Sequence, residues 1–125
     1  GQAVVRKYTG GSTSIYGLAF ANGNIQAQVR DDNDTLISAV ATLPSPTSWH
    51  HVAMTFAGTT VTLFIDGNLV ETDSDPTLVP TDTTGVDFQI GQQGTSARFE
   101  GIIDDVSFFS RVLSNDEISS LAQRG

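Results

Sequence analysis

The stretch WHHVAMTFAGTTVTLFIDG, residues Trp49–Gly67, has the pattern of a β-hairpin. Two strands are expected, at Trp49–Phe56 and Val61–Asp66, because apolar residues alternate with small or polar ones in both, which is the period of strands that bury one face. The four residues between the two runs include a glycine and suit a hairpin connection. The Asp66-Gly67 pair that follows is a strong signal for another tight turn, leading into a further strand over Leu69–Thr72.

The same organisation extends to both sides of this hairpin. Short runs of β-branched and aromatic residues recur between turn residues, with no helical pattern between them. The further strands are expected at Tyr16–Ala21, Ile25–Arg30, Leu36–Ala41, Val86–Gly91 and Ile103–Phe109. Strands at this spacing predict antiparallel pairing in a sandwich or a barrel.

One helix is predicted, near the end of the chain. Ser114 and Glu117 have the spacing of a capping box, in which each side chain bonds the backbone amide of the other residue. Ile118, Leu121 and Ala122 then form one narrow apolar stripe, which is enough to dock a short helix on a sheet.

Composition excludes several classes of function. The chain has 125 residues, which suits one domain, with 14 acidic and 6 basic residues and a net charge of −8. This balance argues against nucleic acid as a partner, because phosphate binding needs clustered lysine and arginine. No apolar run is long enough for membrane insertion, and the absence of cysteine excludes disulfides and zinc–thiolate sites. Abundant Ser, Thr, Gly and Asp with a single lysine favour an exported, bacterial protein.

Several motifs in order resemble one known family. The Trp-x-His-Val-Ala strand that begins at Trp49 and the strand that closes in Asp66-Gly67 resemble the central hairpin of laminin-G-like, concanavalin A-like jelly-roll domains. Residues Gly101–Val106 resemble the closing Gly-x-Ile-Asp-Asp-Val strand of that family, and Leu113–Ile118 resemble its Leu-Ser-x-x-Glu-Ile helix. The resemblance implies an all-β fold of two antiparallel sheets with one short C-terminal helix.

The resemblance covers residues Val4 to Leu121 of a single domain spanning 1–125. The family's opening strands have no counterpart before Gly1, and Val4–Lys7 resemble the strand that ordinarily follows them. A sandwich without its first strands has unpaired edges. We therefore expect self-association, or exchange of strands between copies, through exposed strand edges.

The resemblance also implies a calcium ligand at Asp104, the first Asp of the Ile-Asp-Asp-Val motif. Calcium takes six to eight oxygen ligands, so one carboxylate needs several convergent partners. The alternative is a carboxylate that caps backbone amides. The densest acidic cluster, Asp31–Asp34, lacks the register of an EF-hand loop and is expected to be a solvated turn.

The expected function is a non-catalytic binding module of a secreted or cell-surface protein. Its partner would be a glycan or an extracellular protein, and Trp49, the only tryptophan, is expected in the core. Polar and aromatic residues near loop ends are the candidate ligand-binding groups: Tyr16, Arg30, Gln92, Gln93 and Arg98.

Two alternatives come from other classes of protein. The first is a purely structural spacer or assembly domain, which would bind nothing. The second is a glycoside hydrolase that uses Glu71 and Asp73, because alternate residues of a strand can place two carboxylates about 5 Å apart. Pro76 follows these residues closely and indicates the end of a strand, which disfavours the hydrolase.

Overall fold

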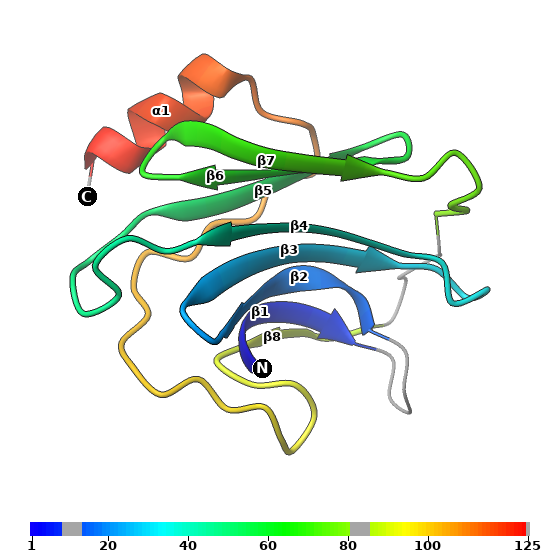
Figure 1. The fold of residues 1–125 in the computed structure, drawn as a ribbon, viewed down its shortest axis with the longest axis horizontal. Helices are drawn as coiled ribbons and strands as arrows, with labels where there is room; N and C mark the ends of the chain where they lie inside the picture. The colour runs from blue at the N-terminus through cyan, green and yellow to red at the C-terminus, as the bar shows by residue number, and fades with distance from the viewer. Residues whose placement is uncertain (9–13, 81–85, 125) are drawn as a thin grey trace.

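The chain folds into two antiparallel sheets with one helix against the smaller sheet (Figure 1). The computed structural model describes residues 1–8, 14–80 and 86–124. The strand order is β4-β3-β2-β1-β8 in the large sheet and β5-β6-β7 in the small one. This arrangement confirms the fold class expected from the sequence. Within the described ranges no helix has the length and apolar character needed to cross a bilayer.

The element bounds follow the sequence pattern closely. The large sheet contains β1 (Gln2–Tyr8), β2 (Ser14–Ala21), β3 (Asn24–Arg30), β4 (Leu36–Thr42) and β8 (Phe88–Ile90). The small sheet contains β5 (Val52–Ala57), β6 (Thr60–Ile65) and β7 (Asn68–Ser74), and helix α1 spans Asn115–Arg124.

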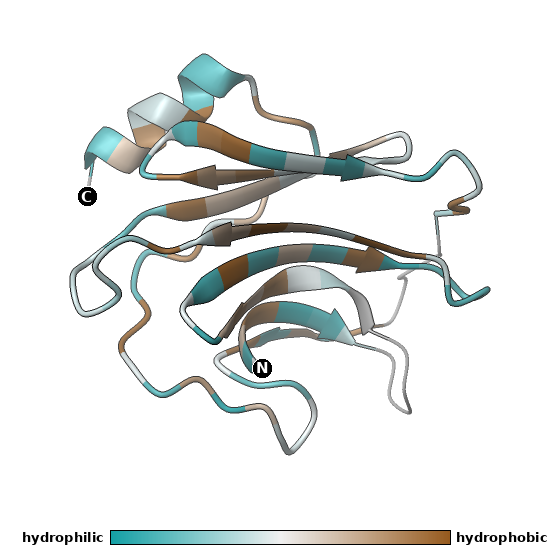
Figure 2. Cartoon of the chain, viewed as in Figure 1, coloured by the Kyte–Doolittle hydropathy of each residue, from teal (hydrophilic) through white to brown (hydrophobic). Residues whose placement is uncertain are grey.

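The main core lies between the inner faces of the two sheets. Apolar and polar residues alternate along β3, so only one side of the strand contributes to the core (Figure 2). Val61, Leu63 and Ile65 of β6 face the same core and are at most 5% exposed. Val52 and Met54 of β5 pack against them, as the alternation predicts.

A second packing layer lies between the small sheet and α1. Phe64 is 1% exposed, but it falls outside the main core cluster because it alternates with Leu63 and Ile65. It therefore faces the side of the sheet that α1 covers (Figure 1). Ile118 of α1 is equally buried and is also outside the main cluster.

The predicted capping box starts α1. The Ser114 hydroxyl accepts from the Glu117 amide at 3.2 Å, and Glu117 Oε1 accepts from the Ser114 amide at 3.0 Å. Arg111 donates from Nη1 to Glu117 Oε1 at 2.9 Å. Mainly through this Arg111 hydrogen bond, the pKa of Glu117 is lowered to about 2, so the carboxylate stays charged at the helix N-terminus.

The two sheets also meet along one edge. Asp73 of β7 accepts from the Ser38 amide of β4 through Oδ2 at 2.8 Å. Both strands are at the edges of their sheets, so this bond satisfies a backbone donor that would otherwise be free.

The strand expected at Ile103–Phe109 is not formed. In the described chain, residues 101–113 take part in no sheet and no backbone-to-backbone hydrogen bond, and Asp105 has a left-handed φ of 53°. Phe108 instead rests on Tyr16 and Phe88, with ring centroids 6.4 and 5.4 Å away. The β propensity of this segment is therefore not sufficient for it to pair with either sheet.

Trp49 is also placed differently from the expectation. It is 67% exposed and is not part of the core. Regular strand geometry begins only at Val52, so the alternation that buries Val52 and Met54 does not extend back to Trp49.

Candidate functional site

The outer face of the large sheet carries one row of residues across its five strands. Arg6 of β1 is the Cα partner of Gly17 in β2 and of Gln89 in β8. Gly17 is in turn the partner of Gln28 in β3, which is the partner of Ser38 in β4. These five residues, Arg6, Gly17, Gln28, Ser38 and Gln89, are called the outer row below. They alternate with core residues and therefore point away from the core.

Hydrogen bonds connect the members of the outer row. Arg6 Nη2 donates to Gln28 Oε1 at 2.7 Å. Gln28 Nε2 donates in turn to Ser38 Oγ at 3.4 Å and to Gln26 Oε1 at 3.2 Å. Arg6 reaches β3 because Gly17 lies between them: a Cβ on Gly17 would be 2.9 Å from Arg6 Cδ. The row thus offers amide, hydroxyl and guanidinium groups on one face.

Arg6 is a buried cation without a counter-charge. It is 7% exposed, and no carboxylate of the described chain lies within ion-pair distance of it. Its Nε is fully buried and has no hydrogen-bond partner. Burial, and then the nearby charge of Arg30, lower the pKa of Arg6. A buried charge without a partner destabilises a fold, so the chain keeps Arg6 at an energetic cost.

Of the residues expected to bind ligand, the structure places Arg30 at this site and Tyr16 elsewhere. Arg30 is two residues after Gln28 on β3, so the two side chains share the outer face. Its Nη1 lies 3.5 Å from Asp34 Oδ1, in an exposed ion pair. Tyr16 faces inward, where it stacks on Phe108.

Gln92 and Arg98 lie in the loop after β8. Gly91 donates its amide to Val4 O at 2.8 Å, which holds this loop beside the start of β1. Gly91 therefore lies at the opposite end of β1 from Tyr16. The loop then runs back along β8: Gly94 donates its amide to Gln89 Oε1 at 2.7 Å, and its Cβ position is 3.4 Å from the Tyr8 ring. Because Tyr16 faces the core and Arg30 faces outward, the four residues do not form one site. Gln93, in the same loop, pairs through its backbone with Ser96 at 3.0 Å.

Asp104 lies exposed in the unpaired segment 101–113. Its Oδ1 accepts from the Asp105 amide at 2.9 Å. Among the described residues no three His, Asp or Glu side chains come together in a way that could hold a metal ion. Calcium at Asp104 therefore stays a prediction. Thermal unfolding tests it: a midpoint that calcium raises over EDTA, and that Asp104→Asn makes insensitive to calcium, supports the site, and an unchanged midpoint refutes it.

The acidic turn after β3 is not fully solvated, contrary to the expectation. Asp31 is 1% exposed. Its Oδ1 accepts from the amides of Asn33 and Thr35, both at 2.9 Å, and its Oδ2 from the amide of Val79 at 2.9 Å. The carboxylate thus joins the β3–β4 turn to the segment after β7, and next to it Leu78 enters the core. Sequence alone offered no signal for this, because the Val79 amide is distant along the chain.

Asp31→Asn is expected to lower the thermal midpoint by about 5–10 °C. An asparagine would turn its amino group toward one of the three donors, most directly the Val79 amide. Hydrogen bonds from Val79, opposed by burial and reinforced by Thr35 and Asn33, lower the pKa of Asp31. Its stabilisation is therefore complete above the ordinary pKa of 3.8 and is lost as the pH falls below it. Asp32→Asn, in the same turn but exposed, is the control that should leave the midpoint unchanged.

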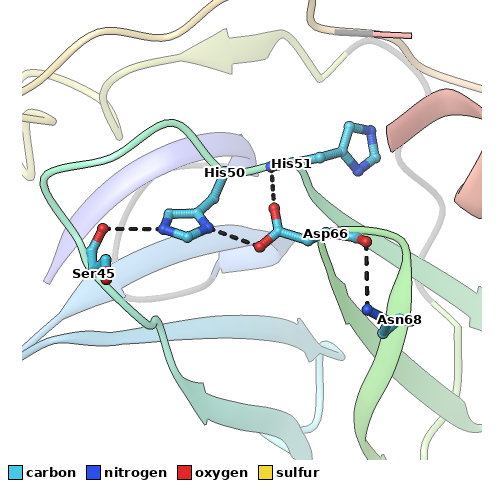
Figure 3. Close-up of polar contacts among 5 residues, drawn as sticks. All are labelled: Ser45, His50, His51, Asp66 and Asn68. Atoms are coloured by element: carbon cyan, nitrogen blue, oxygen red, sulfur yellow. Dashed lines mark hydrogen bonds and ion pairs between the residues drawn. The ribbon is translucent and has the colours of Figure 1, made fainter. Parts of the chain in front are cut away.

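A second polar cluster joins the loop before β5 to the β6–β7 turn (Figure 3). His50 Nδ1 lies 2.8 Å from Asp66 Oδ2, and His50 Nε2 lies 3.0 Å from Ser45 O. Asp66 Oδ1 accepts from the His51 amide at 3.0 Å. Both ring nitrogens of His50 thus face acceptors, and both contacts become hydrogen bonds only when the ring is doubly protonated.

The pKa values of the two adjacent histidines are shifted in opposite directions. The hydrogen bond to Asp66, and then the Ser45 carbonyl, raise the pKa of His50 above 6.5. Burial lowers the pKa of His51, whose Nδ1 is enclosed without a partner. Partial burial alone would raise the pKa of Asp66, but the bonds from His50 and His51 lower it. The cluster thus favours a charged His50 beside a neutral His51.

We expect NMR titration to resolve the two rings, with His50 titrating above and His51 below the ordinary pKa of 6.5. The His50 contribution to stability is complete below pH 6.5 and is lost as the pH rises through its raised pKa. The His51 contribution to stability depends on pH in the opposite way: it is complete above pH 6.5 and is lost as the pH falls below that value. Asp66→Asn, which tolerates the left-handed φ of 53° here, should lower the pKa of His50. An unchanged His50 titration in this variant would contradict the assignment.

Comparison with known proteins identifies the family. A family model described as the concanavalin A-like lectin/glucanases superfamily (Laminin_G_3) matches residues 1–119. The chain belongs to this superfamily. No curated protein matches the chain.

One solved structure resembles this superfamily member. It is the crystal structure of an S-layer domain-containing protein (residues 221–444) from Clostridium thermocellum. The sequence identity is 30% and the TM-score is 0.54, over 86% of this chain. The chain spans 55% of that structure, so roughly half of the neighbour's length has a counterpart here.

Because the superfamily name includes glucanases, the geometry of Glu71 and Asp73 is informative. The two residues are paired with Leu63 and Val61, so they lie on one side of the edge strand β7. Both Asp73 oxygens accept backbone amides, from Ser38 at 2.8 Å and Ser74 at 2.9 Å. Glu71 Oε1 accepts from the Thr72 amide at 3.0 Å. These carboxylates bind the backbone of their own chain.

Proposed function

We propose that the chain is a non-catalytic binding module of a bacterial cell-surface or secreted protein, and that its ligand, a glycan or an extracellular protein, binds the outer face of the large sheet. The observation that supports this most directly is the outer row, in which hydrogen-bonding side chains extend across neighbouring strands. The superfamily contains lectins, and the structural neighbour is an S-layer domain-containing protein.

The chemistry of the outer row suits a polar ligand. Gln28 and Ser38 of the row, and Gln26 beside Gln28 on β3, are each only half-buried, so part of each residue is open to solvent. Planar amides can bond pairs of vicinal hydroxyl groups, and the rigid sheet holds them in fixed positions. Asp73, by contrast, is occupied by backbone amides, which supports a non-catalytic role.

The proposal is tested by binding to a panel of cell-wall polysaccharides and surface proteins. Gln26→Ala should weaken binding to the ligand found by at least fivefold, because it removes a side chain from the centre of the face. Ser120→Ala, which is exposed on α1 far from the large sheet, is the matched control and should bind as the wild type does. If both variants bind equally well, the outer face is not the binding surface.

A structural spacer is the second candidate, and the S-layer domain-containing neighbour favours it. The two candidates differ in what they bind. A spacer should show no saturable retention on any member of the panel and should contribute only mechanical length. Saturable retention that depends on Gln26 excludes the spacer.

A further inference from the structure

The charge of Arg6 has no partner in the described chain. An arginine side chain remains protonated in proteins, so burial does not neutralise it. Nη2 donates to the neutral amide oxygen of Gln28, and Nε is fully enclosed with no acceptor. Arg6 keeps a small exposed fraction, 7%, through which a ligand would have to reach it.

A second cation increases this excess of positive charge. Arg30 is close enough to lower the pKa of Arg6, and its own ion pair with Asp34 is long and exposed. Arg6 is level with Gln28 on the outer face, and Arg30 is two residues further along β3 on the same face. Two guanidinium groups on one sheet face repel each other unless an anion lies between them. Gln28 bonds Arg6 and lies two residues before Arg30 on β3. Its side chain is neutral and does not supply that negative charge.

Building on the proposed function, we propose that Arg6 and Arg30 bind the anionic group, a carboxylate or a sulfate, of an acidic sugar. Guanidinium groups match the planar, bidentate geometry of such anions. Gln26, Gln28 and Ser38 lie next to the pair along the outer face and would bond the hydroxyl groups of the same saccharide.

The overall charge of −8 does not prevent this binding. At physiological ionic strength the field of exposed carboxylates is screened beyond about 8 Å, whereas a partly buried guanidinium is screened much less. Local charge therefore decides the binding at this face. The same argument predicts that affinity falls as salt is added.

The test compares a galacturonic acid hexamer, a sulfated galactose hexamer and the neutral galactose hexamer by calorimetry. At least one acidic hexamer should bind at least tenfold more tightly than the neutral one, and the two acidic probes distinguish carboxylate from sulfate. Arg6→Met, which keeps the length of the stem and removes the charge, should weaken acidic binding by at least tenfold. Arg124→Met, at the exposed end of α1, is the matched control and should not change it.

Thermal unfolding adds a readout that separates binding from structure. Without ligand, Arg6→Met should have the same midpoint as the wild type or a higher one, because a buried, unpaired charge has been removed. The acidic hexamer should raise the midpoint of the wild type and not that of the variant. A lower midpoint with unchanged binding would show that Arg6 is structural and would overturn the proposal.

The remaining outcomes of these experiments also test the anion site. Equal binding of the acidic and neutral hexamers overturns the anion site. If Arg6→Met does not fold, Arg30→Gln replaces it, and an unchanged acidic affinity in that variant overturns the site. Binding that requires Gln26 but not Arg6 rejects the anion site and leaves the proposed function intact. Failure of every glycan and protein probe to bind contradicts both.

Discussion

The substitution Gly17→Ala is expected to destabilise the fold strongly and to move its unfolding to a much lower urea concentration. A Cβ on Gly17 would lie 2.1 Å from Val5 O and 2.9 Å from Arg6 Cα, and both are backbone atoms. β1 is hydrogen-bonded to β2 on one side and β8 on the other, so it cannot move away from the new methyl group alone. Overpacking usually costs 1–3 kcal/mol, and we expect about 3 kcal/mol or more, a large share of the stability of a small domain.

Urea unfolding followed by circular dichroism measures this effect. Gly58→Ala is the matched control: it also has a positive φ, 61°, but no atom lies within 4 Å of its Cβ position. It should therefore show only the backbone strain, about 1 kcal/mol. Equal losses in the two variants would mean that the contact with β1 does not determine the need for glycine at Gly17.

The second large effect is expected for Phe64→Ala. Phe64 is 1% exposed and fills the layer between the small sheet and α1, and truncating a buried phenylalanine costs about 3–5 kcal/mol. Because Phe64 is outside the main core cluster, we expect α1 to loosen first, so helical ellipticity should decrease at lower urea than the β signal does.

Leu69→Ala is the control for Phe64→Ala. Leu69 is the Cα partner of Phe64 in β7, but it is 50% exposed, so its truncation should cost about 1 kcal/mol or less. Coincident loss of the helical and β signals in Phe64→Ala would contradict a separate helix layer. A cost similar to that of Leu69→Ala would show that this layer collapses around the cavity.

Local features of the fold could be predicted from the sequence because their causes lie within a few residues. Asp66 and Gly67 both adopt positive φ at the two turn positions, as a tight hairpin turn with right-handed strand twist requires. The capping box of Ser114 and Glu117 depends on only four residues, and it formed as predicted.

Features that depend on distant partners could not be predicted. Ile103–Phe109 has the composition of a strand, but a strand also needs backbone pairing with a distant neighbour, which composition does not show. The burial of Asp31 depends on the amide of Val79, which folding brings to it from 48 residues away.

The candidate site also combines a feature that the sequence pattern could show with one that depends on distant partners. Arg30 was singled out from its place near a loop end, and the structure confirms only that it shares a face with Gln28. Arg6 was not singled out, although its position one residue after two valines already placed it on the face opposite Val5. What the pattern could not show is that this arginine would be buried beside Arg30 without an acidic neighbour.

The pairing of β1 with both β2 and β8 has a consequence for the order in which the chain assembles. β2, β3 and β4 follow β1 as successive antiparallel neighbours, and these pairs can zip up through short turns. Val5 meets Ile90 only after the residues between them have been synthesised and arranged, which is the slow, long-range step. Until then one edge of β1 is open, and Arg6 lacks its neighbour Gln89. The outer row is therefore completed last, and the interval before β8 docks is when a nascent chain is most exposed to mispairing with another strand.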